Sequence, residues 1–272
     1  MDYQTFEPHK DLSAFVKCYW VLKIPKQSHP QRQRIVPDGC IEMIFTPGEP
    51  VKRYLPDDSY ILQPRAMVLG QITEPLYIEP IGRVDVFSVR FYPGGFTPFV
   101  TLPLTDMENR DVELEELFGK DGVSLEHNVL GAGTTSERIQ HVETFLLDKL
   151  KDAKTIHHIV KSTVDAILSS GGRLSVEQVS KEVVASRRQL ERRFSSAVGL
   201  SPKQLAKIIR LQTALKMLLN GEATSLTDLS YENGYYDQAH FIKDFKEFTG
   251  LSPKAFYSAD NLKLSSIFYA ED

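Results

Sequence analysis

Short runs of apolar and β-branched residues, separated by turn signals, occupy the first 115 positions of the chain. The predicted strands are 16–24, 34–36, 40–45, 67–69, 76–78 and 84–91. Pro37-Asp38-Gly39 predicts a tight turn between the second and third of them, and Pro93-Gly94-Gly95 ends the series. Strands of this length and spacing are typical of a β-sandwich or a small β-barrel.

The spacing of apolar positions then changes to the three-and-four period of amphipathic helices. Ser136–Lys151 carries one such stripe, and a second runs over 156–167 before a Ser-Ser-Gly-Gly segment ends it. The polar stretch Asp152–Thr155 between the stripes predicts a hinge, which divides the chain into domains at 1–152 and 153–272. The first stripe fits either a dimer helix or a helix packed on its own domain.

A pentapeptide occurs twice in the helical half of the chain. Gly199-Leu200-Ser201-Pro202-Lys203 returns as Gly250-Leu251-Ser252-Pro253-Lys254, and a Phe precedes both copies by the same interval. In each copy the Gly predicts a left-handed helix end, the Ser an N-cap and the Pro the first turn of the next helix. Repetition at such a period indicates one supersecondary unit used twice.

Each unit has the pattern of two short helices joined by a tight turn. In the first unit Val184-Ala185 is the predicted turn, and Ser186 predicts an N-cap that a Gln three residues later completes as a capping box. In the second unit Asn233-Gly234 is the turn and Asp237 the N-cap. Between the units, Pro202–Leu219 is predicted as one long helix that fixes them relative to each other.

The region Leu174–Tyr257 resembles the DNA-binding domain of the AraC/XylS family, most clearly over Gly234–Lys246 and the Gly-Leu-Ser-Pro that follows it. The resemblance implies two helix-turn-helix motifs, at about 174–198 and 224–249. Their second helices would enter successive major grooves on one face of DNA, about 34 Å apart. The chain departs from the family at Val184, where Gly is usual, so the first turn is expected to differ in detail.

The resemblance assigns DNA contacts to outward positions on the second helix of each unit. The predicted contact residues are Arg188, Glu191 and Arg192 with the adjacent Ser186 and Arg187, Gln238, Ala239 and Lys243, and Lys203 and Lys254 beside helix N-termini that favour phosphate. Solvated helix faces also carry such charges, and that alternative stays open for each Arg and Lys. Because Ala239 has no hydrogen-bonding group, the second helix is expected to use phosphate anchoring and contact with a thymine methyl.

The N-terminal half shows a fainter resemblance, carried by Cys18-Tyr19-Trp20, Val36–Glu42, Gly70-Gln71 and Val89–Gly95. These segments are similar to a β-rich domain often joined to AraC-type regulators, which senses a small molecule, dimerises or does both on a cupin-like barrel. The expected fold is therefore α+β. It combines an N-terminal cupin-like barrel and flanking helices with an all-α C-terminal domain of two helix-turn-helix motifs joined by a long helix.

Arg90 is the most notable candidate in a ligand pocket, because it lies in an otherwise apolar strand and a strand Arg can anchor a carboxylate or phosphate. Trp20 and Glu42 are the companion candidates. The structural alternative is an ion pair of Arg90 with Glu42 or with Asp38, and it is the favoured one.

An enzyme fused to a DNA-binding module is the competing hypothesis. A metal cupin would need a His-x-His pair with a following Glu and a later His, and the histidines at 9, 29, 127 and 141 do not have this spacing. Cys18 and Cys40 lie in apolar strands without an adjacent His or basic helix end, so an activated thiol is not expected. The sequence thus predicts neither a catalytic site nor a cofactor.

Composition changes this picture little. The net charge is −4, but 171–258 holds about 13 Lys and Arg against about 9 Asp and Glu, so the basic excess lies in the repeated region. Two cysteines and the lack of a membrane-span or signal-peptide pattern indicate a cytoplasmic protein. We expect a regulator that binds double-stranded DNA, with a small-molecule effector, homodimerisation and RNA polymerase contact as further expectations. An N-terminal half that only dimerises is the third hypothesis, and activation or repression stays open.

Overall fold

The computed structural model describes residues 1–151, 158–182, 186–220 and 225–257. The strands are β1 (Asp2–Phe6), β2 (Val16–Ile24), β3 (Gln33–Ile35), β4 (Ile41–Phe45), β5 (Val51–Tyr54), β6 (Tyr60–Leu62), β7 (Ala66–Leu69), β8 (Leu76–Pro80), β9 (Val84–Phe91) and β10 (Asp111–Glu113). Two 3-10 helices, η1 (Thr97–Phe99) and η2 (Leu104–Met107), and three α-helices, α1 (Leu114–Phe118), α2 (Lys120–Gly131) and α3 (Thr135–Lys151), complete this half.

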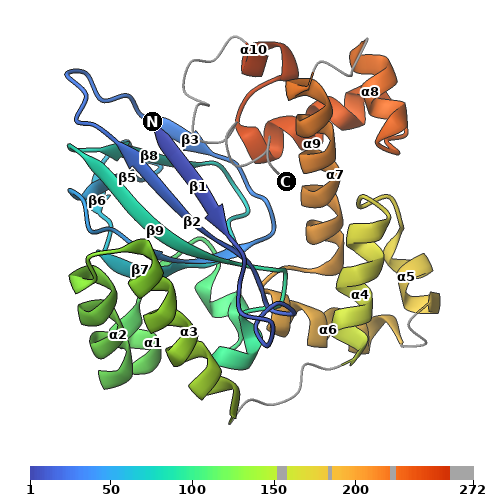
Figure 1. Cartoon of the computed structure of the whole chain (residues 1–272). Coiled ribbons are helices and arrows are strands. Elements are labelled where there is room, and N and C mark those ends of the chain that lie inside the picture. The colour runs from blue at the N-terminus through green and yellow to red at the C-terminus, as the bar shows by residue number, and fades with distance from the viewer. Residues whose placement is uncertain (152–157, 183–185, 221–224, 258–272) are drawn as a thin grey trace.

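The strands form two antiparallel sheets that lie face to face (Figure 1). The larger has the order β1-β2-β9-β4-β7-β10 and the smaller the order β3-β8-β5-β6. The predicted β-rich domain is confirmed, and its described strands make two sheets rather than one closed barrel. The predicted strands 16–24 and 84–91 coincide with β2 and β9, whereas the sequence pattern missed β1, β5, β6 and β10.

The central strand β9 is buried on both faces. Its side chains point alternately to the two faces of the sheet, and an apolar layer covers each face. Phe87 and Val89 point into a core shared with the helices. Val84 and Val86 point to the other side, where they pack with Trp20 and with side chains of the smaller sheet. The space between the sheets is thus an apolar layer of its own.

Helix α3 packs on its own domain, which decides between the two alternatives for this stripe. Val142 and Leu146 are fully buried in the core beneath the larger sheet. Arg138 on the same helix donates from Nη1 to Asp85 Oδ1 of β9 at 3.3 Å, and both side chains are largely buried. The apolar stripe of α3 is therefore not available as a dimer surface.

The C-terminal half is helical. It contains α4 (His158–Ser169), α5 (Val176–Glu182), α6 (Arg187–Val198), α7 (Pro202–Leu219), α8 (Leu226–Glu232), α9 (Gln238–Thr249) and α10 (Pro253–Tyr257). The long helix α7 has the predicted bounds and separates two groups of helices, with α4, α5 and α6 at one end and α8, α9 and α10 at the other (Figure 1). One hydrophobic core runs through both groups.

In both copies the duplicated pentapeptide ends one helix and begins the next, as predicted. Gly199 and Gly250 end α6 and α9 with φ of 82° and 72° in the left-handed region, where a residue with Cβ is strained. Ser201 forms a full capping box with Gln204 at the start of α7, and Ser252 Oγ accepts from the Ala255 N–H at the start of α10. The two copies therefore end α6 next to the start of α7, and α9 next to the start of α10.

Two sequence predictions lie outside the described residues: the hinge at Asp152–Thr155 and the turn at Val184-Ala185. Helix α4 packs into the C-terminal core through Val160 and Val164. The domain boundary near residue 152 stays a prediction. The turn at Asn233-Gly234 is described, and Gly234 adopts the positive φ of 71° that such a turn requires.

Candidate nucleic-acid interface and internal cavity

Helix α6, the predicted recognition helix of the first unit, presents its basic residues to solvent. Leu190 and Phe194 are fully buried and hold the helix on the C-terminal core. Because residues two positions from a buried one on a helix point away from the core, Arg188 and Arg192 are exposed, while Glu191 is half-buried. Ser186 Oγ caps the helix by accepting from the Gln189 N–H at 3.4 Å, which is one of the two bonds of the predicted capping box. The side chain of Arg187 lies outside the described set.

Helix α9, the predicted recognition helix of the second unit, has the same construction. Phe241 and Phe245 are fully buried with their rings 5.5 Å apart, and Asp237 Oδ1 caps the helix by accepting from the His240 N–H at 2.8 Å. Ala239 and Lys243 are exposed and lie with Lys246 in one shallow groove along the outer face of α9. Two of the three predicted reading positions of this helix, Ala239 and Lys243, therefore share one surface.

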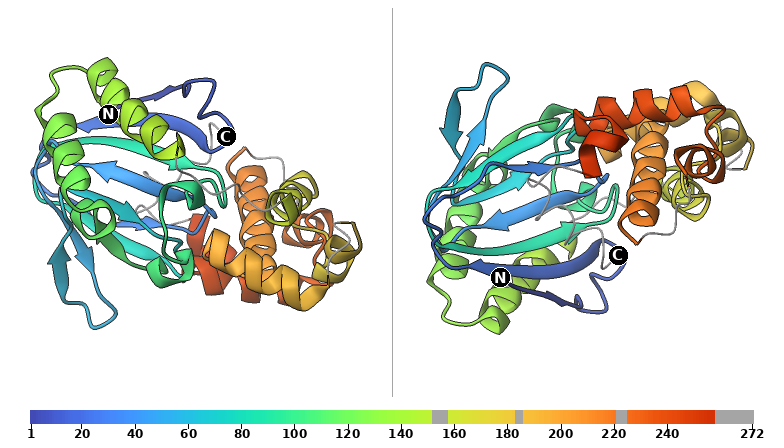
Figure 2. Two further views of the ribbon diagram at one scale, coloured as in Figure 1. Left: turned by 90° about the horizontal axis from the view of Figure 1, so that it is seen from below. Right: turned by 90° about the horizontal axis from the view of Figure 1, so that it is seen from above.

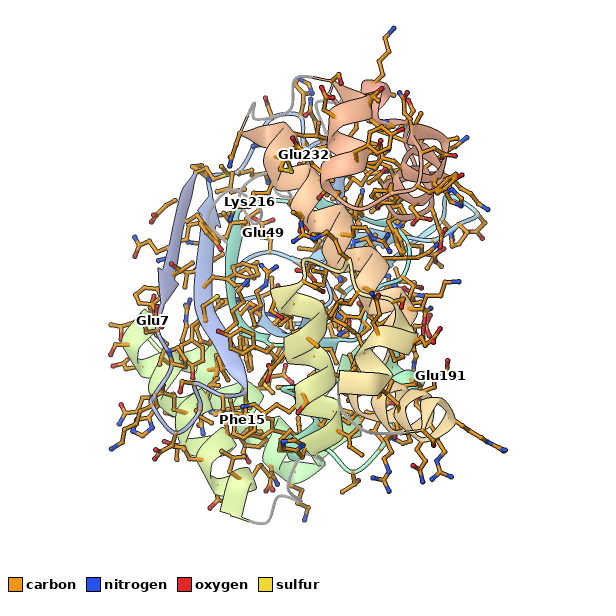
Figure 3. All side chains as sticks on the ribbon, turned by 90° about the vertical axis from the view of Figure 1, so that its right-hand side faces the viewer. Glu7, Phe15, Glu49, Glu191, Lys216 and Glu232 are labelled. Carbon is orange, nitrogen blue, oxygen red and sulfur yellow. The ribbon has the colours of Figure 1, made fainter. Side chains whose placement is uncertain are left out.

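The remaining predicted contacts lie at the edges of these helices. Gln238 is half-buried, and its Oε1 accepts from Thr227 Oγ1 of α8 at 3.4 Å. Lys203 and Lys254 are both exposed in the first turns of α7 and α10. Lys207 of α7 donates to Asp244 of α9 at 2.9 Å, which ties the second recognition helix to the long helix. Figure 3 shows Glu191 of the first unit and Glu232 of the second at opposite ends of the helical domain.

The sequence reasoning missed Tyr236, whose side chain is 85% exposed directly before the cap of α9. Tyr231 at the end of α8 is 63% exposed. Tyrosine hydroxyls are common partners of DNA phosphates, and two exposed aromatic side chains beside a recognition helix are consistent with that role. Their position next to the predicted turn was the available signal.

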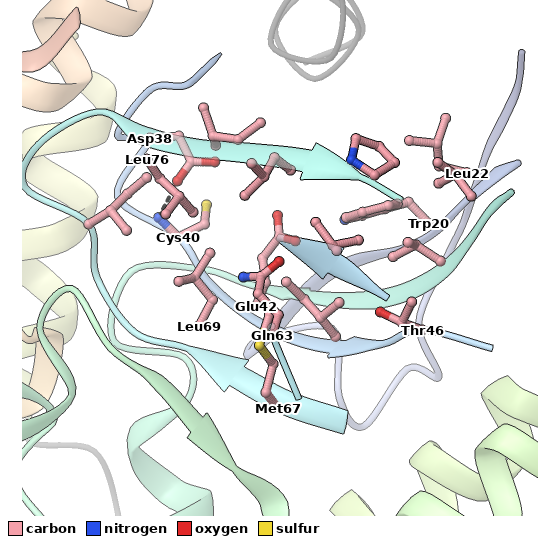
Figure 4. A pocket seen from close by; sticks show the side chains of 18 of the residues that line it. Trp20, Leu22, Asp38, Cys40, Glu42, Thr46, Gln63, Met67, Leu69 and Leu76 are labelled. Atoms are coloured by element: carbon pink, nitrogen blue, oxygen red, sulfur yellow. Dashed lines mark hydrogen bonds between the residues drawn. The ribbon is translucent and has the colours of Figure 1, made fainter. Parts of the chain in front are cut away.

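A cavity of about 110 Å³ lies between the two sheets. Its walls are mainly aliphatic, and the polar side chains on it are those of Glu42, Gln63, Asp38 and Thr46. Figure 4 shows the Glu42 carboxylate near the middle of the cavity beside Gln63, with the ring of Trp20 farther along the same wall. A dry apolar cavity of comparable size, about 150 Å³, is large enough to bind benzene.

Arg90, the predicted anchor, is held by the two carboxylates that the sequence offered as its structural partners. Its Nη2 donates to Asp38 Oδ2, and its Nε lies 3.9 Å from Glu42 Oε1. Arg90 does not line the cavity with Trp20 and Glu42. It lines a second pocket at the junction of the domains, together with Lys17 of β2 and Lys216 of α7.

Beside the cavity one guanidinium, that of Arg90, faces two carboxyl groups, those of Asp38 and Glu42. Burial is the largest influence on the Glu42 carboxyl and raises its pKa to about 7. Arg90 opposes this rise, Asp38 adds to it, and hydrogen bonds from Ser88 and Trp20 again lower it. Ser88 Oγ donates to Glu42 Oε2 at 3.0 Å. A carboxylate held in this way favours a ligand that brings a positive charge or a hydrogen-bond donor.

The described part of the chain contains no group of three or more His, Cys, Asp or Glu side chains arranged to hold a metal ion. Both cysteines are free thiols. Burial raises the pKa of the Cys40 thiol to about 12, so the reactive thiolate is disfavoured at neutral pH. No helix among the described residues has the length and apolar character needed to cross a bilayer.

The walls of the cavity continue into the contacts between the two domains. Val36, a cavity residue, is fully buried in the C-terminal core. The next residue, Pro37, accepts a hydrogen bond at its carbonyl from Gln212 Nε2 of α7 at 2.5 Å. A Cβ on Gly39 would lie 2.7 Å from Leu205 Cδ1 of the same helix. The turn predicted at 37–39 therefore packs directly against α7.

The segment 71–77, which follows β7 and includes the start of β8, contacts both copies of the pentapeptide. A Cβ on Gly199 would lie 3.1 Å from Gln71 Cγ and from the Leu104 carbonyl oxygen, and one on Gly250 would lie 3.2 Å from Tyr77 Oη. Leu76 of the same segment lines the cavity. The cavity is thus bounded by one segment that contacts α7 and by another that contacts the glycines at the ends of α6 and α9.

Two protein families match separate parts of the chain. Residues 179–259 match a helix-turn-helix domain family, and residues 4–113 match a family described as a domain of unknown function (DUF6597). The first match includes α6 and α9 with the long helix between them. The second covers both sheets.

Curated relatives match about a third of the chain. An uncharacterized HTH-type transcriptional regulator of Haemophilus influenzae is 33% identical over 87 residues, which are 32% of this chain and 29% of that protein. The HTH-type transcriptional regulator MtrA of Neisseria gonorrhoeae is 31% identical over 100 residues, 37% of this chain and 32% of that protein. The chain thus aligns with about a third of the length of each of these relatives.

Among solved structures, ToxT from Vibrio cholerae covers 94% of this chain and 98% of its own, at 12% identity and a TM-score of 0.48. Because the TM-score is below 0.5, this likeness carries no argument about function.

Proposed function

We propose that this chain, which carries a C-terminal helix-turn-helix domain of the AraC type, is a sequence-specific DNA-binding transcription regulator. One observation carries the proposal: two predicted recognition helices, each capped and held by buried apolar residues, lie at opposite ends of one long helix with their polar faces in solvent. Rigid placement of two such helices suits two successive major grooves.

The two helices would contribute differently to recognition. Arg188 and Arg192 on α6 can each make bidentate contacts with guanine, which is the commonest specific contact in the major groove. On α9 the exposed Ala239 and Lys243 offer an apolar contact and a phosphate contact. We therefore propose that α6 supplies most of the base discrimination, and that α9 with Tyr236 supplies mainly affinity and register.

The cavity between the sheets is the proposed effector site. Its small volume and aliphatic walls suit a small, largely apolar molecule, and Glu42 suits one that carries an amine or another hydrogen-bond donor. The ring of Trp20 can also pack against a cation. An anionic effector is not proposed for this cavity, because Arg90 is held by Asp38 and Glu42 and does not line it.

An effector in the cavity could regulate DNA binding because two segments at the cavity also contact the helical domain. An effector that displaces the turn at 37–39 or the segment at 71–77 would change the surfaces against which α7, Gly199 and Gly250 pack. The effector can shift the equilibrium only by the difference in its affinity for the two arrangements. We propose a purely binding function without catalysis, in the cytoplasm where the DNA lies. RNA polymerase contact stays a prediction.

Selection of bound sequences from random DNA by the full-length protein tests this function. The selected fragment should bind at least about a thousandfold more tightly than unrelated DNA at physiological salt. A salt titration should show the linear loss of affinity that phosphate contacts produce. Equal affinity for selected and unrelated fragments would contradict the proposal.

A further inference from the structure

The two predicted recognition helices are held by different parts of the molecule, although they occupy equivalent places in the duplicated unit. Helix α9 is bonded to the long helix α7 of its own domain, whereas the end of α6 is bonded to the N-terminal domain. In Figure 2 the helical domain meets one end of the two sheets, and the β5–β6 hairpin projects from the other end. The placement of α6 therefore involves a contact between domains.

Helix α9 is tied to α7 through the side chain of Lys207. Its Nζ donates to Asp244 Oδ1 at 2.9 Å and to Glu247 Oε2 at 3.2 Å, and it lies 5.9 Å from the centre of the Phe248 ring. Asp244 is buried, and charge-assisted hydrogen bonds are stronger than neutral ones. This connection lies wholly inside the helical domain.

The first unit lacks the carboxylates that this connection needs. The units are 51 residues apart, so the equivalent of Asp244 is Arg193 and the equivalent of Glu247 is Ser196. Neither side chain is an anion that binds an ammonium group. A copy of the Lys207 contact therefore does not hold α6.

The last turn of α6 is held instead by the 3-10 helices of the N-terminal domain. Thr97 Oγ1, at the start of η1, donates to the carbonyl of Ala197, one of the last four carbonyls that a helix leaves without an internal partner. Helix η2 lies directly against α6. A Cβ on Gly199 would lie 3.1 Å from the backbone carbonyl oxygen of Leu104 in η2. These contacts fix the end of α6 against the N-terminal domain.

The wall of the cavity lies against the same 3-10 helix. Gly70 lines the cavity, and a Cβ on it would lie 1.8 Å from the carbonyl oxygen of Met107 in η2, an approach too close for any side chain. At the end of α9, the atoms nearest to a Cβ on Gly250 belong to the side chains of Tyr77 and Pro75, at 3.2 and 3.5 Å. A displacement of the cavity wall therefore reaches α6 through backbone atoms.

A small tilt at the end of α6 is enough to change its contacts with bases. Arg188 precedes Ala197 by nine residues, which is about 13 Å along a helix. A tilt of about 10° at Ala197 then moves the backbone of Arg188 by about 2 Å, whereas a binding site must be held within about 0.5 Å of its productive geometry. The contact at Ala197 thus sets whether the arginines of α6 reach their bases.

We propose that Thr97 is a positioning residue for α6. Through it the N-terminal domain controls the half-site that α6 reads, while Lys207 holds α9 independently of the N-terminal domain. This inference rests on the proposed function and adds which of the two helices the cavity regulates. Loss of the Thr97 hydroxyl should therefore lower base discrimination at one half-site and not at the other.

Equilibrium binding of the full-length protein to two DNA fragments tests the proposal. The first is the selected fragment. In the second, the base pairs at which Arg188→Ala/Arg192→Ala loses its preference, which mark the half-site of α6, are replaced. Thr97→Val keeps the shape of the side chain without the donor and should reduce the preference for the first fragment at least about tenfold, as the loss of one bidentate base contact would. Its affinity for the second fragment should equal that of wild type.

Lys207→Met is the matched control on the other helix. It should weaken binding to both fragments by the same factor, because both keep the half-site of α9, and should leave the preference between them unchanged. Thr97→Ser keeps the hydroxyl and should behave as wild type. Thr97→Ala removes the same hydroxyl and takes the place of Thr97→Val if that variant does not fold.

Three outcomes would overturn the inference. They are an unchanged preference in the Thr97 variants without a hydroxyl, an equal loss of affinity for both fragments in those variants, and a changed preference in Lys207→Met. A wild-type protein that does not prefer the selected fragment over unrelated DNA would instead contradict the proposed function, so the two proposals fail separately.

Discussion

Replacement of Glu42 by Gln should abolish a pH-dependent loss of stability of the N-terminal domain. The carboxyl loses its proton near its ordinary pKa of 4.5 in the unfolded chain and near 7 in the folded one. Between these values the folded state holds a proton that the unfolded state has released, so the unfolding free energy falls as pH rises from 4.5 to 7. Below that window the carboxyl is protonated in both states and has no such effect.

The size of the effect follows from the two pKa values. Each pH unit between them corresponds to about 1.4 kcal/mol, which amounts to roughly 3 kcal/mol over the window. Glu42→Gln keeps the shape of the side chain and cannot ionise. The difference in unfolding free energy between the variant and wild type should therefore grow by roughly 3 kcal/mol in favour of the variant between pH 4 and pH 8.

The single tryptophan makes the assay specific. Trp20 lines the same cavity as Glu42, so its fluorescence during urea unfolding reports on the N-terminal domain. Glu79→Gln is a control variant for which the pH dependence of stability should have the opposite sign. Burial favours the neutral form of Glu79, but the hydrogen bonds from Lys52 and Tyr54 outweigh it and lower the pKa, so this carboxylate should stabilise at neutral pH and lose its effect in acid. A difference between Glu42→Gln and wild type that does not change with pH would refute the reasoning.

Three other perturbations have expected outcomes. Arg192→Ala should weaken binding to the selected DNA by about 1–3 kcal/mol and relax preference at one base pair, as seen by repeating the selection with the variant. Tyr236→Ala should weaken binding to all fragments alike, and a change in sequence preference would contradict a phosphate contact. Gly199→Ala should lower the unfolding free energy by about 1–2 kcal/mol because φ there is 82°, and an unchanged thermal unfolding curve would contradict strain at this position.

The helical half was predictable because its signals are local. The bounds of α7 followed from a Ser-Pro start and a regular apolar stripe, and the N-caps of α6 and α9 from Ser186 and Asp237. The sequence also predicted that each pentapeptide ends one helix and begins the next. Its further role, contact of both glycines with the N-terminal domain, depends on docking between distant segments and has no sequence signal.

The β-rich half was less predictable because strand pairing is non-local. β2 and β9 carry long alternating runs and were placed correctly, whereas β5, β6 and β10 are short and polar or exposed. The sequence grouped Arg90, Trp20 and Glu42 as candidates. Only the register, which sets Arg90 opposite Glu42 across β9 and β4, shows that the guanidinium is held by carboxylates while Trp20 and Glu42 face the cavity.

Competition binding of the full-length protein to its selected DNA tests the central claim most directly. A labelled selected fragment is titrated with unlabelled selected and unrelated DNA at fixed salt, for wild type and for Arg188→Ala/Arg192→Ala. The proposal predicts that wild type prefers the selected fragment at least about a thousandfold and that the double variant loses most of this preference while retaining salt-dependent binding to any DNA. A wild-type protein displaced equally by both competitors would contradict it.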